Sequence, residues 1–252
     1  MIDAPDGVAP RGVMHSGGRL LMILTLPELW AGAALVFSIL SNLQPADGRS
    51  RLWFLDQALL AGFLLSLWAY RRGWLPVRLR PSRFWPAFAF VGSAWLTGML
   101  YELSLSGGDG HSVGGFHPQT NLSFLLAQGQ YVPLALFGLA VVRRYRCSIR
   151  AMFFMAGAMS MYEMLSAGML SSLASLHLLV FALFMVAYYV TVYAMFLCWP
   201  FLLIGPAPGQ VAGLRELSWR RSLTYGLLGG LFIWVLFVLW SWLLDSLGLP
   251  VM

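Results

Sequence analysis

The chain has 252 residues, of which 59% are apolar and only 10% are charged, and its formal net charge is +6. Soluble domains carry about a quarter of their residues as charged side chains. A water-soluble fold of this length needs more charged residues to cover its surface. The composition therefore predicts a polytopic membrane protein. All sixteen basic residues are arginines, which excludes a cofactor held as a lysine Schiff base, such as retinal or pyridoxal phosphate.

Seven apolar runs, bounded by arginine, proline, glycine or polar clusters, approach the roughly 20 residues that a membrane-spanning helix needs. They cover residues 20–40, 52–70, 84–103, 123–142, 151–170, 176–204 and 222–244. The sixth run is longer than a straight crossing requires, and Pro200 near its end predicts a kink or a tilt. We therefore expect an all-α membrane protein with a seven transmembrane helix bundle. Residues 1–19 would form a cytoplasmic tail and residues 20–252 a single membrane domain.

The arginines are distributed unevenly between the two sets of connections. Fourteen of the sixteen lie in the N-terminal tail and in the connections after the second, fourth and sixth runs, whereas Arg49 and Arg51 lie in the other set. Positive residues mark the cytoplasmic side, so the N-terminus is expected to be cytoplasmic and the C-terminus periplasmic or extracellular. The same distribution explains the positive net charge as anchoring to lipid head groups, so the lipid bilayer is the expected partner and nucleic acid is not.

Two further features concern the compartment. The exclusive use of arginine is typical of a GC-rich genome and favours a bacterial inner membrane. Glu28 lies inside the first apolar run, which indicates a retained helix and not a cleaved signal sequence. Cys147 and Cys198 both fall on the cytoplasmic side in this topology and are expected to be free thiols.

Most of the acids outside the tails lie on the side opposite the arginines. Glu163 lies well inside the fifth run, where a carboxylate costs about 2.5–3.5 kcal/mol, and Glu102 ends the third run. Each follows a tyrosine, Tyr101 and Tyr162, which is consistent with an internal repeat or with chance. Glu163 is interpreted either as a proton-handling or ligand-contacting acid or as a hydrogen-bonded structural residue, and both glutamates are candidate catalytic residues.

The longest connection, about residues 104–122, is rich in glycine and carries several polar side chains. His111, His117 and the later His177 are candidate metal ligands, while Asp109, Gln128 and Gln130 are candidate ligand-binding residues. The histidine spacing matches no known zinc signature. Three interpretations therefore stay open: a divalent-metal site, a substrate-contacting or gating loop, and a plain exposed loop.

Two motifs inside the apolar runs have structural as well as functional interpretations. Met155 and Met159 are four residues apart, which would place two thioethers on one helical face as a copper site requires, although methionine also fills apolar interfaces. Gly226, Gly229 and Gly230 are interpreted as a close-packing helix face.

Three classes of function remain. The first is a non-enzymatic subunit, assembly factor or scaffold of a membrane complex, which would have protein partners in the membrane. The second is a transporter or permease component that uses Glu163 and Glu102 as proton or cation sites. The third is an outer-face enzyme, with or without a metal, that acts on a lipid or lipid-linked substrate.

Overall fold

The computed structural model describes residues 26–42, 53–74, 85–106, 129, 131–166, 179–204 and 213–248. Within these ranges the chain forms helices and no β-strand. The helices are α2 (Pro27–Ser41), α3 (Trp53–Arg71), α4 (Trp85–Ser106), α6 (Tyr131–Arg144), α7 (Ile149–Ser166), α9 (Leu179–Ile204) and α10 (Trp219–Ser246). Each of the seven predicted runs overlaps with one of these helices, so the all-α prediction is confirmed.

Two helices in the described part of the chain are long and apolar enough to cross a membrane. These segments are Leu179–Leu203 in α9 and Trp219–Ser246 in α10. The helix α2 is apolar but has only 15 residues. The helix α9 continues through Pro200 to its end at Ile204.

Short local signals set several helix ends. Ser148 accepts a hydrogen bond from the backbone N–H of Ala151 at 3.1 Å and so caps α7. Ser218 caps α10 in the same way, through the N–H of Arg221. The helix α3 ends at Arg71 and is followed by Gly73, whose φ of 71° lets the N–H of Trp74 reach the carbonyl oxygen of Ala69 at 2.9 Å.

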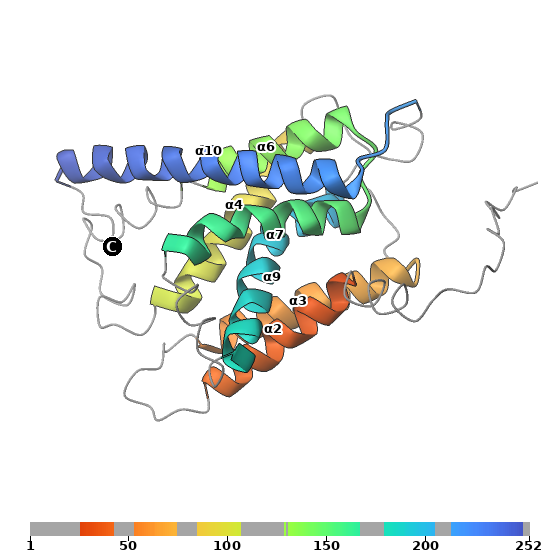
Figure 1. The fold of residues 1–252 in the computed structure, drawn as a ribbon, viewed down its shortest axis with the longest axis horizontal. Helices are drawn as coiled ribbons and strands as arrows, with labels where there is room; N and C mark the ends of the chain where they lie inside the picture. The colour runs from red at the N-terminus through yellow and green to blue at the C-terminus, as the bar shows by residue number, and fades with distance from the viewer. Residues whose placement is uncertain are drawn as a thin grey trace, which may run out of the picture.

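The helix α9 lies at the centre of the bundle and contacts α2, α3, α4, α6 and α7. On one side of it lie α2 and α3, and on the other lies α7, which in turn carries α10 (Figure 1). The helix α10 packs on α7 and, to a smaller extent, on α6. It is therefore the outermost helix of the described bundle.

Contacts between helices fix their relative directions. Arg71 at the end of α3 pairs with Glu28 at the start of α2, while Ser38 near the end of α2 bonds Asp56 near the start of α3. These two helices are therefore antiparallel. In contrast, Gly226 lies against Met155, and four residues later along both helices Gly230 lies against Met159, so α7 and α10 run parallel (Figure 1).

As a result the bundle has two chemically different ends. The described arginines lie in or next to the first turns of α7 and α10 and the last turns of α3 and α6. They are Arg71, Arg72, Arg143, Arg144, Arg146, Arg150, Arg215, Arg220 and Arg221. We call this the arginine end. Asp56, Glu102, Glu163 and Asp245 lie toward the opposite end, which we call the acidic end.

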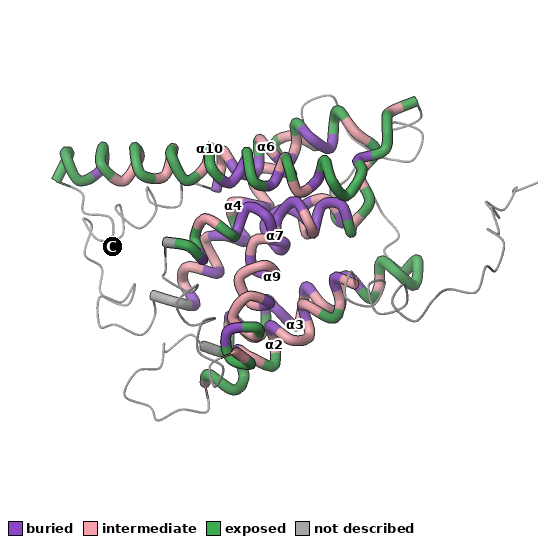
Figure 2. The backbone as a smooth tube through the Cα atoms, in the orientation of Figure 1, coloured by how far each residue is buried: buried purple, intermediate pink, exposed green. Residues whose placement is uncertain are grey.

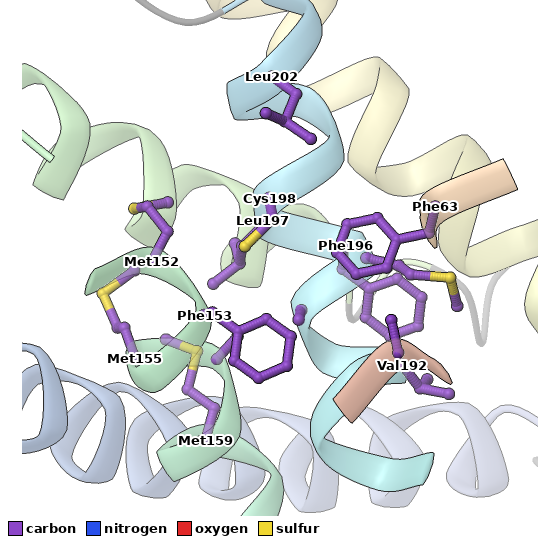
Figure 3. Packing of buried hydrophobic residues seen from close by; sticks show 14 of the residues in the cluster. Phe63, Met152, Phe153, Met155, Met159, Val192, Phe196, Leu197, Cys198 and Leu202 are labelled. Atoms are coloured by element: carbon purple, nitrogen blue, oxygen red, sulfur yellow. The ribbon is translucent and has the colours of Figure 1, made fainter. Parts of the chain in front are cut away.

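The core is a single apolar cluster around α9, with buried side chains from α7 and α3 on its two sides (Figure 3). Met155 and Met159 belong to this core and are 0% and 1% exposed. The methyl group of Met159 reaches Gly229 of α10. This environment favours the packing interpretation of the two methionines over a copper site.

The three glycines of α10 face α7 and are buried. A Cβ atom on Gly226 would lie 2.3 Å from the carbonyl oxygen of Met155. Such an approach is possible only without a side chain, so the predicted close-packing face is confirmed.

The opposite face of α10 is broad, apolar and exposed along the length of the helix (Figure 2). Its exposed large side chains include Leu227, Leu228, Leu231, Phe232, Val235, Val238, Leu239 and Trp242. Soluble monomers rarely expose contiguous apolar patches above a few hundred Å². A helix of this kind indicates an environment of lipid or of another apolar surface.

Candidate functional site

The first group of the candidate site is a buried carboxyl near the start of α3. Asp56 is 6% exposed and accepts two hydrogen bonds. One comes from the hydroxyl of Ser38 on α2 at 2.5 Å, and the other from the hydroxyl of Tyr188 on α9 at 3.0 Å. Three helices thus meet at this carboxyl group.

A second carboxyl, Glu102, lies in the last two turns of α4 and is half-buried. It accepts a hydrogen bond at 2.5 Å from the hydroxyl of Tyr131, the first residue of α6. The Tyr131 ring packs directly over Gly98 one turn earlier on α4. This contact leaves no room for a side chain at residue 98 and positions the phenol beside the glutamate.

The third carboxyl, Glu163, lies on α7, three residues before the helix ends, and is exposed. It forms a hydrogen bond with the Tyr193 side chain of α9. Glu163 also lies close enough to Glu102 for the two carboxyl groups to interact electrostatically. The two glutamates selected from the sequence therefore do converge.

These groups form one connected network. Tyr101 is hydrogen-bonded to Tyr188 and interacts electrostatically with Asp56 and Glu163, while Tyr193 interacts with both glutamates. We call the set the carboxyl–tyrosine cluster. Its members are Asp56, Glu102, Glu163, Tyr101, Tyr131, Tyr188, Tyr189 and Tyr193.

The ring of Phe196 forms the floor of this cluster on the side of the arginine end. Its centroid is 4.7 Å from the ring of Tyr131, 5.9 Å from that of Tyr101 and 6.0 Å from that of Tyr193. Phe196 is itself 2% exposed. The three phenol rings therefore share an apolar contact, while the hydroxyls of Tyr131 and Tyr193 bond glutamates and that of Tyr101 bonds Tyr188.

The cluster contains three carboxyl groups. All described arginines lie at the arginine end, and the chain contains no lysine. Phenol hydroxyls donate hydrogen bonds to the three carboxyl groups. Such an arrangement can hold protons or accept a small cation.

The other predicted site residues lie outside the described residues. These are Asp109, His111, His117, Gln128, Gln130 and His177. Among the residues that the structure does describe, no three histidine, cysteine, aspartate or glutamate side chains are grouped as a metal site requires. The predicted metal site therefore stays a prediction.

Sequence reasoning missed most of the partners of the two glutamates. Tyrosine counts as apolar where apolar runs are used to predict helices, yet five of the nine tyrosines belong to the cluster. Tyr188, Tyr189 and Tyr193 follow one another on α9, and this concentration of hydroxyls in an apolar run was the available signal. Within each Tyr-Glu pair, the glutamate bonds a tyrosine from another helix and not its neighbour in sequence.

Comparison of the chain with protein family models, with curated proteins and with solved structures found no match.

Proposed function

We propose that this protein is a multi-pass membrane protein of the bacterial inner membrane that takes up protons or small cations at the carboxyl–tyrosine cluster, as a transporter component. The supporting observation is that Asp56, Glu102 and Glu163 are joined to one another through hydrogen bonds and electrostatic interactions with tyrosines of α4, α6 and α9. Carboxyl groups at membrane depth are costly and are commonly used for proton or ion handling.

Seven crossings with a cytoplasmic N-terminus form part of this proposal. Consecutive helices whose contacts are resolved run in opposite directions, and the described arginines gather at one end. Under the positive-inside rule the arginine end is cytoplasmic. The acidic end then faces the periplasm, and the C-terminus lies on the same side.

The carboxyl groups differ in accessibility in a way that suits uptake from that side. Glu163 is exposed, Glu102 is half-buried and Asp56 is buried. A proton or cation would meet Glu163 first and continue through Tyr193, which interacts with both glutamates. Tyr101 and Tyr188 extend the network to Asp56.

Ion flux through the purified protein in liposomes tests this proposal. Vesicles that contain a pH-sensitive dye are given an inside-negative potential with a K⁺ gradient and valinomycin, and proton entry is recorded. A parallel series without valinomycin replaces the dye with Na⁺-sensitive and K⁺-sensitive ones and applies a gradient of the ion that is measured. We expect wild-type protein to raise the flux of at least one ion above that of empty vesicles, and Glu163→Gln to abolish the increase.

Asp245→Asn is the matched control. Asp245 is an exposed acid at the same end of the bundle, outside the cluster, and its substitution should leave the flux unchanged. Equal loss in both variants would show that only the surface charge matters. A wild-type flux no greater than that of empty vesicles, for all three ions, would remove the proposal.

A second candidate is a subunit or scaffold of a membrane complex, and it is favoured by the exposed apolar face of α10. Native gel electrophoresis of mildly solubilised membranes tests it. A subunit would migrate in a complex much larger than the 28.0 kDa chain and its micelle, and a chain that migrates alone would argue against it.

A further inference from the structure

A pocket at the arginine end is separate from the carboxyl–tyrosine cluster. It has a volume of about 510 Å³ and is lined by Arg144, Tyr145, Arg215, Arg221, Thr224 and Tyr225. This volume lies in the range of small-molecule sites, about 300–1,000 Å³. Its lining contains three guanidinium groups, three hydroxyl groups and no carboxylate.

Hydrogen bonds between two backbone segments bring these arginines close together. The N–H of Arg146 donates to the carbonyl oxygen of Arg215, and the N–H of Leu217 donates to that of Arg146, both at 3.0 Å. This bridge fastens the connection between α6 and α7 to the segment before α10. It places Arg144, Arg215 and Arg221 around one opening although they come from three different segments.

The charge of these three arginines is not neutralised by the described part of the chain, where none of them forms an ion pair. Because like charges at short range repel, the arrangement is stable only with an anion or with solvent screening. The start of α10 adds the positive end of a long helix dipole. The pocket therefore has the electrostatics of an anion site.

The hydroxyl groups complete the donor set. Tyr145 and Tyr225 are joined by a hydrogen bond of 2.7 Å between their hydroxyls. This hydrogen bond, together with the charges of Arg144 and Arg221, lowers the pKa of Tyr145. A more acidic phenol is a stronger donor to a phosphate oxygen.

The position of the pocket distinguishes a lipid from a free anion. Trp219, at the start of α10, is 59% exposed, and tryptophan at a helix end is typical of the head-group level of a bilayer. From Thr224 onward, the next turns of α10 expose Leu227, Leu228 and Leu231. A phosphate in the pocket would thus have its acyl chains directly beside this apolar face.

We propose that this pocket binds the phosphodiester head group of an anionic phospholipid. Arg144, Arg215 and Arg221 would contact the phosphate oxygens, because guanidinium groups bind phosphate with paired hydrogen bonds. Tyr145 and Thr224 would donate further bonds. The lipid would fasten the connection between α6 and α7 to the start of α10.

The test uses the full chain in neutral detergent, with dioleoylphosphatidylglycerol as the probe and dioleoylphosphatidylcholine as the zwitterionic comparison. Binding is followed by native mass spectrometry and by the rise in Tm with lipid concentration. Each arginine near a lipid head group contributes about a fivefold change in affinity. Arg144→Gln with Arg221→Gln should therefore weaken phosphatidylglycerol binding about 25-fold.

The matched control is Arg143→Gln with Arg220→Gln, which removes the same charge from the neighbouring positions. Successive helical residues project about 100° apart, and neither Arg143 nor Arg220 lines the pocket. Arg220 instead stacks on Trp219 at 5.4 Å. We expect the control to keep wild-type binding. If the pocket pair does not fold, Arg215→Gln alone, in the segment before α10, should show about a fivefold loss.

Three results would overturn the proposal. Equal weakening in the pocket and control pairs would show non-specific attraction to charge. Equal binding of phosphatidylcholine would show that the anionic head group is not recognised. An equal Tm shift with sn-glycerol 3-phosphate or inorganic phosphate at the same concentration would show a site for a free anion instead of a lipid.

Discussion

The contact between α7 and α10 depends on glycine, and Gly226→Ala tests it most directly. The added Cβ would lie 2.3 Å from the carbonyl oxygen of Met155 and 2.5 Å from the Cβ of Ala158. Carbon contacts are favourable at about 3.5–4 Å, so the helices must separate by about 1 Å at this point. The obstacle is backbone, which cannot rotate away as a flexible side chain can.

The expected magnitude follows from two opposing effects. Overpacking by one methyl group costs about 1–3 kcal/mol, while replacing glycine by alanine inside a helix gains about 1 kcal/mol. The helix α10 has few other contacts, so it cannot distribute the displacement over several neighbours. Because the obstacle is backbone, the upper end of the overpacking cost applies, and about 3 kcal/mol less about 1 kcal/mol leaves a loss of about 2 kcal/mol in the free energy of unfolding.

Unfolding by SDS in mixed micelles, followed by fluorescence of the 11 tryptophans, measures this loss. Gly92→Ala in α4 is the control, because nothing lies within 4 Å of a Cβ at residue 92. It should be neutral or stabilising by up to about 1 kcal/mol. Identical midpoints for the two variants would refute the close approach of α7 and α10.

Three further predictions concern single contacts. Burial raises the pKa of the Cys147 thiol to about 12, so maleimide labelling should be at least a hundredfold slower than for an ordinary thiol at pH 8. The labelling rate should still rise tenfold per pH unit up to pH 10, where the rate of an ordinary thiol no longer changes. A labelling rate that stops rising near pH 9 would contradict the burial of Cys147. Tyr188→Phe removes a donor from buried Asp56 and should lower the free energy of unfolding by about 1–3 kcal/mol, and an unchanged SDS midpoint would argue against the bond. Arg71→Gln should lower the free energy of unfolding by about 1 kcal/mol, because it removes the exposed ion pair with Glu28. A double-mutant cycle with Glu28→Gln should give a coupling energy of the same size. A coupling energy of zero would show that the two side chains lie close together without stabilising the fold.

The positions of the helices could be predicted from apolar runs, but their first residues could not. The helix α7 begins at Ile149 and α10 at Trp219, two and three residues earlier than the runs indicated. The reason is that Arg150, Arg220 and Arg221 are polar and were counted as connection, although they lie inside helices. The N-cap serines at 148 and 218 carry the correct signal.

Apolar composition also could not show which helix is central. The helices α9 and α10 both consist almost entirely of apolar residues, yet α9 touches five other described helices and α10 is peripheral. In a membrane the lipid-facing side is as apolar as the core, so hydropathy does not distinguish the two positions. The three glycines of α10 did indicate its buried face, because small residues allow backbones to approach.

The candidate site was predictable only in part for the same reason. A carboxyl in an apolar run is conspicuous, and Glu102 and Glu163 were selected on that basis. Asp56 is not among the candidate residues of the sequence analysis, because its burial depends on Ser38 and Tyr188, which are 18 and 132 residues away in sequence. Which helices are neighbours is a tertiary property that a single sequence does not contain.

The cluster and the arginine end are separated by Phe196, and this has a consequence for the proposed transport. Phe196 packs against the rings of Tyr101, Tyr131 and Tyr193 on the side of the arginine end, and the proposed uptake route enters from the acidic end. Pro200, four residues later on α9, has no N–H to donate to the carbonyl oxygen of Phe196. Because sharp helix bends occur mostly at proline, the proposed transport predicts that α9 bends between Phe196 and Pro200 when the cluster opens toward the arginine end.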